Sequence, residues 1–474
     1  LIQKFQLDLD MRPSDSKDSI LDTANDLVNQ KIIPITERLL DEWADENTHI
    51  QLDRLEIDLG DIPLDTLTHS LPDAYEKKIK ETLKRLFLQE KLKFNDEHFR
   101  KTRKQALLDQ LIFYLKEGEF PWQGSLNSAD DLVLELLRTK KGKLERLKPL
   151  LKRNYLVDRL VGSLQADTLD LLLAELTFPD AATQAMLLIG ELVRYTHLTK
   201  LNIHRKQIES AVYREAFNAV GHDKIIFSGK TISRTFCDLI GLLNLDEQER
   251  TNYQKQFVKF SRREKFLSQF IDISDELQKQ LSKINSKKVD AFQAENELEK
   301  RQTREQQKNI SNISNAGVIL IYPYLKTLFD RLNWLNNQEF VNEDCQSKAL
   351  LITDYLTYGN RDVVPEHELV LNKILCGMEP RESLNPLAIL TNVEKEEADD
   401  LLDSAIKHWS ILKDTSPEGY RLSFLRREGI LMFREGNWFL RVERKGFDML
   451  LEHLPYTISI VRLPWMKNKL FVEW

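Results

Sequence analysis

The sequence predicts a mainly α-helical protein with small β elements, of the α+β class. Residues 72–245 carry apolar residues at i, i+3, i+4 and i+7, the spacing of helices that bury one face. Both ends of the chain instead contain short stretches in which apolar and polar residues alternate, as in half-buried strands. Residues 246–312 are rich in charged residues and Gln, which predicts a charged linker or an exposed helix.

The first 71 residues predict a strand–helix–strand unit. Apolar and polar residues alternate over residues 4–10 and again over residues 54–59, where Gly60 ends the pattern. Between them, apolar residues recur at helical spacing from Ile20 to Ile32. Pro34 is expected to kink or restart this helix, because proline lacks the N–H that a helix interior needs.

Residues 72–245 predict a helical domain whose connections are short and contain Gly or Pro. The expected helices include Tyr75–Glu90, Lys104–Lys116, Ala129–Leu137, Leu156–Glu175, Ala182–Arg194 and Ile208–Val220.

Residues 313–474 predict a C-terminal α+β domain with a hairpin. The turn Arg434–Asn437 contains a Gly-Asn pair, which suits a tight turn between two apolar runs. The other expected elements are an apolar stretch from Ala316 to Leu335, helices near Cys345–Leu356, Glu368–Leu375, Glu394–Leu412 and Gly446–Leu454, and closing strands at Thr457–Val461 and Leu470–Val472.

Composition sets limits on function. The chain has 474 residues, 30% of them charged, with a formal net charge of -7, which argues against general nucleic-acid binding. No apolar run approaches the roughly 20 residues of a membrane-spanning helix, so no membrane insertion is expected. The three cysteines are widely spaced and match no metal motif, which favours reduced thiols in the cytosol.

No pattern of catalytic, cofactor-binding or metal-ligating residues emerges. His367 lies in Pro-Glu-His-Glu without the partners of a zinc motif, so a helix start is the simpler interpretation. The carboxylates of the first region are better explained as the polar face of a sheet than as a cation site. These carboxylates are Asp8, Asp10, Glu56, Asp58 and Asp61.

Two segments are candidates for protein interaction. The chain ends in an aromatic and aliphatic stretch that includes Pro464, Trp465 and Trp474, directly after Arg462. This end is predicted either to pack in the core or to dock on a partner, since aromatic residues anchor both. The second segment is the basic run of residues 138–153, an amphipathic turn and helix or a partner site, with Lys140, Lys141, Lys143 and Arg146 as its candidate residues.

Several motifs together resemble the contractile injection system tape measure protein family. They occur in order at both ends and in the middle of the chain. They are IQKFQLDL at residues 2–9, IQLDRLEIDLG at 50–60, FYLKEGEFPW at 113–122, NAGVILIYPYL at 315–325, EHELVLNKILCG at 366–377, HW at 408–409, FLRREG at 424–429, IVRLPWMK at 460–467 and the final VEW at 472–474.

The resemblance implies a non-enzymatic structural component of a phage-tail-like particle, involved in tube assembly or length determination. It also implies tube, baseplate or cap proteins as partners, assembly in the cytoplasm, a place in or on the particle, and no cofactor. An alternative is an adaptor or chaperone that docks a tube, baseplate, cap or cargo protein. A literal ruler fits poorly, because even one unbroken helix of this length would reach only roughly 700 Å and the Pro- and Gly-containing domains are far shorter.

Overall fold

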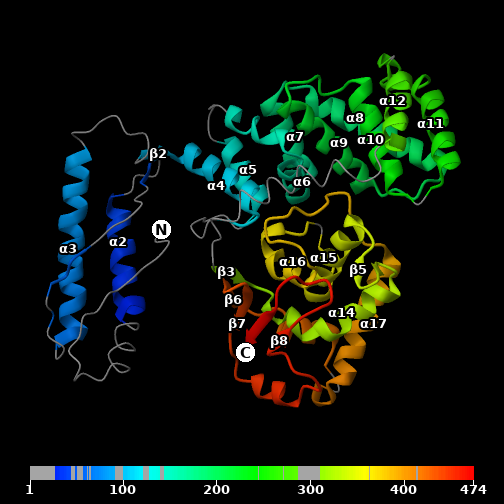
Figure 1. Ribbon diagram of the computed structural model, residues 1–474. Coiled ribbons are helices and arrows are strands. Elements are labelled where there is room, and N and C mark those ends of the chain that lie inside the picture. The colour runs from blue at the N-terminus through cyan, green and yellow to red at the C-terminus, as the bar shows by residue number, and fades with distance from the viewer. Residues whose placement is uncertain are drawn as a thin grey trace. The chain divides into compact units, whose positions relative to one another are not determined.

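The computed structural model describes residues 27–43, 48–50, 57–60, 62, 66–90, 100–120, 128–138, 144–243, 245–270, 272–286, 310–361, 363–412 and 415–474. The chain forms two compact units (Figure 1). Unit 1 comprises Leu1–Leu111 with Pro121–Ser125, and unit 2 comprises Ile112–Phe120 with Leu126–Trp474.

Unit 1 is built on a helical pair. A π-helical turn, η1 (Val28–Ile32), leads into α2 (Ile33–Trp43), which packs against α3 (Leu67–Glu90). Strands β1 (Thr48–Ile50) and β2 (Arg100–Thr102) pair antiparallel. The core residues are Leu27, Ile32, Leu39, Leu71, Tyr75, Ile79 and Leu83.

The predicted N-terminal unit is only partly described. Pro34 lies where the π-helical turn η1 passes into α2, so the helix changes its hydrogen-bonding pattern at the predicted position but continues through it. The first predicted strand, residues 4–10, lies outside the described residues, as does most of the second. Its described part, residues 57–60, is not in a strand.

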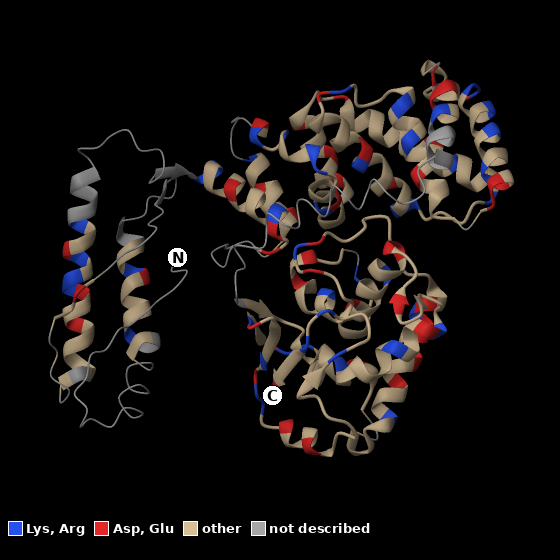
Figure 2. Ribbon diagram, in the orientation of Figure 1, with Lys and Arg blue, Asp and Glu red and all other residues tan. Residues whose placement is uncertain are grey.

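The first half of unit 2, called here the helical part, is a bundle of short helices. Charged residues of both signs are distributed over these helices (Figure 2). The first element, α4 (Arg103–Glu117), belongs to unit 2 only from Ile112 onward. The others are α5 (Ala129–Arg138), η3 (Leu144–Arg146), η4 (Leu150–Lys152), α6 (Asn154–Ser163), α7 (Ala166–Leu176), α8 (Ala181–Thr199), α9 (Arg205–Gly221), α10 (Gly229–Gly241), α11 (Glu247–Ser261), η5 (Leu267–Gln269) and α12 (Ile273–Ser286).

Two features of the helical part differ from the prediction. The expected single helix Leu156–Glu175 is two helices, because Leu164 and Gln165 are extended and the Gln165 N–H donates to Asp130, 2.8 Å away. Residues 247–286 form α11 and α12, which bury Phe257 and Leu277 instead of lying exposed. Residues 287–309 of the predicted linker lie outside the described residues, and the four-domain division of the chain stays a prediction.

The second half of unit 2, the C-terminal part, packs helices against a small sheet. Its elements are β3 (Ile310–Ile313), η6 (Ala316–Ile321), α14 (Tyr322–Arg331), β4 (Leu335–Asn336), β5 (Glu339–Phe340), α15 (Glu343–Tyr358), η7 (Glu366–Leu369), α16 (Val370–Leu375), α17 (Asn392–His408), η8 (Ser410–Leu412), α18 (Pro417–Tyr420), η9 (Arg421–Leu425), β6 (Gly429–Arg434), β7 (Asn437–Val442), η10 (Asp448–His453), β8 (Ile460–Val461) and β9 (Leu470–Glu473).

The sheet has five strands in the order β3-β6-β7-β9-β8. The hairpin β6–β7 turns through Glu435 and Gly436, both with positive φ, as a two-residue hairpin turn requires. Strand β9 runs parallel to β7 and antiparallel to β8. Together with two two-stranded sheets and the helices, this confirms a mainly α fold with small β elements.

Tight packing fixes helical turn η6 beneath the sheet. A Cβ placed on Gly317 would lie 1.7 Å from the carbonyl oxygen of Phe424, so only glycine fits there. Residues Ala316–Ile321 are all buried, so this apolar stretch lies in the core of the C-terminal part.

Candidate functional site

The C-terminal segment is an interior part of the fold. Strand β9 is the fourth of the five strands and is paired on both sides, so the last residues complete the sheet. Leu463, Met466 and Leu470 are buried in the same core as η6 and α15. Burial of these side chains therefore compensates for the conformational entropy that the segment loses on folding, which a frayed terminus does not achieve.

The two tryptophans of this segment contact their own chain. The indole N–H of Trp465 donates to the Leu375 carbonyl at 2.7 Å, and its ring lies 5.4 Å from that of Phe329. The indole N–H of Trp474 donates to Asp448 at 3.0 Å. Both side chains are half-buried, so each packs partly within the fold of its own chain.

Arg462 and Pro464 behave differently, because both are exposed beside these buried neighbours. In the alternation of this segment, Val461 and Leu463 point to the core while Arg462 and Pro464 face outward. A partner that docks at the chain end can therefore reach Arg462 and Pro464 without disturbing the core.

The basic run is described only in part. Lys140, Lys141 and Lys143 lie outside the described residues. Arg146 is exposed in η3, where the neighbouring Leu144 and Leu147 are buried, as the amphipathic interpretation predicts. The role of these four basic residues in protein interaction stays a prediction.

A buried charge cluster, called here the ionic triad, joins the two halves of unit 2. Arg159 of α6 donates through Nε to Glu366 at 3.0 Å, and Lys373 of α16 donates to the same oxygen at 2.7 Å. The Arg159 and Lys373 side chains are 0% exposed and that of Glu366 is 4% exposed. Charges this deep are tolerated only when they are paired and hydrogen-bonded.

Backbone carbonyls satisfy the remaining donors of the triad. Arg159 also donates to the carbonyls of Leu115 and Arg381, and Lys373 donates to that of Pro380 at 3.0 Å. Burial by itself would raise the pKa of Glu366, but the two cations outweigh it and hold the pKa below its ordinary value. Burial lowers the pKa of Lys373, and Glu366 offsets only part of this effect.

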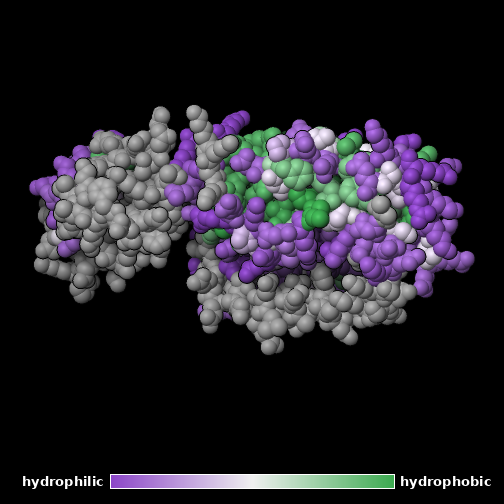
Figure 3. Space-filling view, turned by 90° about the horizontal axis from the view of Figure 1, so that it is seen from above, coloured by the Kyte–Doolittle hydropathy of each residue, from purple (hydrophilic) through white to green (hydrophobic). Residues whose placement is uncertain are grey.

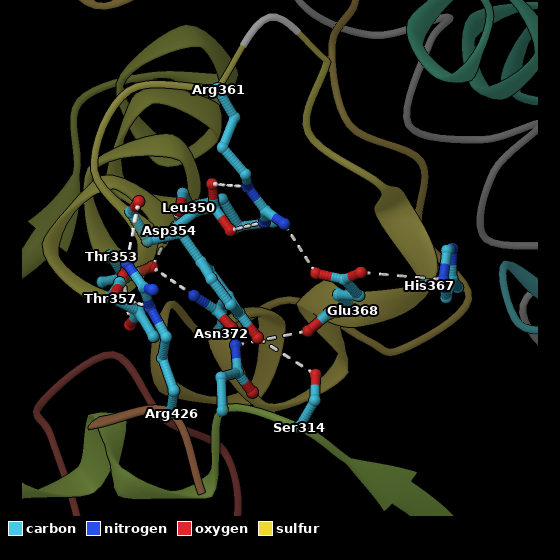
Figure 4. Close-up of polar contacts among 12 residues, drawn as sticks. Ser314, Leu350, Thr353, Asp354, Thr357, Arg361, His367, Glu368, Asn372 and Arg426 are labelled. Atoms are coloured by element: carbon cyan, nitrogen blue, oxygen red, sulfur yellow. Dashed lines mark hydrogen bonds and ion pairs between the residues drawn. The ribbon is translucent and has the colours of Figure 1, made fainter. Parts of the chain in front are cut away.

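A second polar cluster surrounds Arg361 (Figure 4). Arg361 pairs with Asp354 and, at 2.7 Å, with Glu368, and its guanidinium lies 4.0 Å from the centre of the Tyr358 ring. Burial raises the pKa of Asp354 to about 6, against the lowering effect of Arg361. Below it, the buried Asn372 amide donates to Thr353 at 2.9 Å.

His367 borders this cluster and faces aromatic rings. It lies edge-on to Phe120, with ring centres 4.7 Å apart, and burial lowers its pKa. A helical turn, η7, starts at Glu366 as predicted, but the cap expected for a capped helix start is absent, because Pro365 at the N-cap has no polar side chain. Within the described ranges no three His, Cys, Asp or Glu side chains lie close enough to hold a metal ion. Of the acidic residues considered for a cation site, only Asp58 is described.

Both clusters hold together segments distant in sequence. Arg159 and Glu366 are 207 residues apart, and Arg426 donates to the carbonyl of Thr357 across 69 positions. Sequence reasoning missed Arg159, Glu366 and Lys373. The sequence held one signal, at Arg159. In α6 this charged residue stands at a position where the helical spacing of apolar residues predicts a buried side chain.

These contacts stabilise the fold of unit 2. The polar clusters link segments that are distant in sequence, and the C-terminal strands complete the core of the C-terminal part. The model of the contractile injection system tape measure protein family matches residues 1–474, and the chain belongs to that family. No curated protein and no solved structure matches the chain.

Membership places the chain among structural components of a contractile injection particle, a family that is not a class of enzymes. The resemblance read from the sequence motifs is thereby confirmed. Among the described helices, none is both long and apolar enough to cross a membrane.

Proposed function

We propose that the protein is a non-enzymatic assembly component that acts in building the tube of the particle or in determining its length. The observation that carries the proposal is the family match over the whole chain. Its partners are tube, baseplate or cap proteins, which it meets in the cytoplasm as the particle assembles. The chemistry of the described clusters supports this, because their carboxylates are paired with cations of the same chain.

The protein acts through compactly folded units and not as an extended ruler. The longest described helix, α3, has 24 residues and spans roughly 36 Å. The helices of unit 2 bury their apolar faces against each other, and stretching them along a tube would expose those faces to water. Length information then comes from contacts made by a folded body at one end of the tube.

An insertion separates these two modes of action. Residues 246–312 are the segment whose composition would allow it to extend, but α11 and α12 lie within 247–286 and pack with α10. The insertion therefore belongs in residues 287–309. Duplicating this stretch adds at most roughly 80 Å of extended chain. We expect tubes of unchanged length on electron micrographs, and tubes lengthened in proportion to the insertion would show that this segment measures.

A second candidate is an adaptor or chaperone that docks a tube, baseplate, cap or cargo protein. The exposure of Arg462 and Pro464 next to a completed sheet favours it. Truncation cannot test this candidate, because it would remove the interior strand β9. Arg462→Glu is the suitable variant, with Arg205→Glu as a matched exposed control. Equal recovery of purified particle proteins by both variants would exclude docking through Arg462.

A further inference from the structure

The outer side of the five-stranded sheet carries an apolar row that crosses four strands. Met432 of β6 lies opposite Phe439 of β7, Phe439 lies opposite Phe471 of β9, and Phe471 lies opposite Ile460 of β8. The rings of Phe439 and Phe471 stack with centres 5.1 Å apart. Core residues such as Leu431 and Leu440 occupy the alternate positions and point to the other side.

Two apolar residues on this side of the sheet are open to solvent. Ile460 is 51% exposed and Ile430, which precedes Met432 on the same side, is 40% exposed. In Figure 1, helices α14 to α17 lie to one side of β6 and β7. We call this row with its flanking charged residues the sheet face.

The sheet face carries more cations than carboxylates. Arg434 and Arg441 lie on it and are exposed, and exposed Arg462 and Lys469 directly flank the ends of β8 and β9. Three acids lie on or beside this face: Glu473, which accepts a hydrogen bond from Arg441 at 3.0 Å, and the exposed Glu428 and Glu443, which directly flank β6 and β7. An apolar row bordered by cations fits a partner with apolar anchors and carboxylates.

A surface with those properties lies on the same chain, in the hairpin formed by α7 and α8. Leu171, Phe178, Met186 and Leu187 are 53%, 40%, 54% and 48% exposed, although helices normally turn such residues inward. Leu171 lies five residues before the end of α7 and Met186 five residues after the start of α8, so the antiparallel hairpin brings them level. Figure 3 shows a hydrophobic area on the helical side of unit 2, bordered by hydrophilic residues.

The hairpin is also acidic around these apolar residues. Between Leu160 and Val193 the sequence contains no Lys, Arg or His. The carboxylates of Asp167, Glu175 and Asp180 are exposed around the apolar residues. We call these carboxylates with Leu171, Phe178, Met186 and Leu187 the hairpin face.

We propose that the hairpin face of one copy docks on the sheet face of a second copy, so that the protein associates head to tail with itself. A helical pair covering one side of a sheet is the ordinary way in which such a side is buried. Here the apolar residues of each surface find apolar residues, and the carboxylates of the hairpin meet the cations of the sheet. Because the two surfaces differ, one copy uses both at once, and the contact adds copies in a row or closes a ring.

The test uses the purified full chain and two variants. In the sheet variant, Ile460→Asp and Arg462→Glu remove an anchor and reverse a charge at exposed positions. In the hairpin variant, Leu171→Lys and Met186→Lys remove two apolar anchors and add two positive charges at exposed positions of α7 and α8. Val393→Lys, at a 67% exposed position of α17, is the matched control. Circular dichroism verifies that each variant is folded.

Light scattering over a concentration series should show the wild-type mass rising above 55.6 kDa in multiples, and falling back in 1 M salt. Each variant alone should associate about tenfold more weakly or not at all, whereas the control matches the wild type. The decisive sample is the equimolar mixture. It should form a one-to-one pair and no larger species, because each variant retains the surface that the other one lacks.

Three results would overturn the proposal. A wild-type chain that stays monomeric up to about 100 μM means that these faces meet a different protein. Unchanged association of both variants places the contact elsewhere on the chain. If the wild type associates but the two variants form no pair when mixed, then sheet face binds sheet face, or hairpin face binds hairpin face. None of these results depends on tube assembly, so the proposed function stands or falls separately.

Discussion

Replacing Glu366 by Gln should strongly destabilise unit 2, because it removes the anion that two buried cations share. Gln keeps the size of the side chain and one hydrogen-bond acceptor, but Arg159 and Lys373 would face each other without compensation at zero exposure. Breaking one buried pair costs about 3–5 kcal/mol, and the loss of an anion that serves two cations should lie at the upper end. That is a large fraction of the roughly 5–15 kcal/mol by which proteins are stable.

The free energy of unfolding is measured by urea titration with tryptophan fluorescence, which reports on the C-terminal part through Trp334, Trp409 and Trp465. The control is Glu418→Gln, whose carboxylate is 54% exposed and should contribute less than about 1 kcal/mol. Lys373→Met should cost less than Glu366→Gln, because it leaves a balanced pair. A Glu366→Gln chain as stable as the Glu418→Gln chain would refute the reasoning.

The difference in the free energy of unfolding between the wild type and Glu366→Gln depends on pH, and its direction follows from the pKa of Glu366. The folded pKa of Glu366 lies below its ordinary value of 4.5, so the carboxylate binds protons less readily in the folded state. Its stabilising contribution is therefore complete above about pH 4.5 and is lost as the pH falls through the folded pKa. The difference in the free energy of unfolding between the wild type and Glu366→Gln should therefore become smaller as the pH falls.

Three further predictions concern single sites in unit 2. Gly317→Ala should destabilise by about 3 kcal/mol or more because its Cβ would meet a backbone oxygen, whereas Gly190→Ala, with open space around it in α8, should stabilise by about 0.5–1 kcal/mol; thermal unfolding of both variants checks this. The folded pKa of Asp354, about 6, lies above its ordinary 3.8, so its contribution is present below pH 3.8 and is lost as the pH rises through 6. The wild type should gain stability relative to Asp354→Asn between pH 7 and pH 5, and urea midpoints that move in parallel would contradict this. Trp465→Phe should cost about 1 kcal/mol in urea titrations through loss of the hydrogen bond to Leu375.

Local patterns in the sequence predict most individual elements. The hairpin was predictable because its turn residues and its flanking apolar runs are adjacent in the chain. The helices from Lys104 to Val220 follow from their apolar spacing, and only the break at Leu164 was missed. That break depends on a contact with Asp130, which no local pattern reveals.

Long-range contacts account for what the sequence did not predict. Alternation at residues 470–472 indicates a strand but does not say that it lies parallel to β7, since register depends on neighbours 32 residues away. The ionic triad joins Arg159 to Glu366 across 207 positions. The aromatic C-terminal segment was predicted either to pack in the core or to bind a partner. In the structure, its residues differ in whether they contact the fold or face outward. Trp465 and Trp474 contact the fold, while Arg462 and Pro464 face outward.

The central claim is that this family member is needed to build the tube of a contractile injection particle. Its most direct test is to delete the chain from a strain that makes the particles and to measure particle number and tube length on electron micrographs. Restoring the unaltered chain from a plasmid is the control. We predict few particles, or tubes with a broad spread of lengths, in the deletion strain. Particles in normal number with one uniform length would contradict the account.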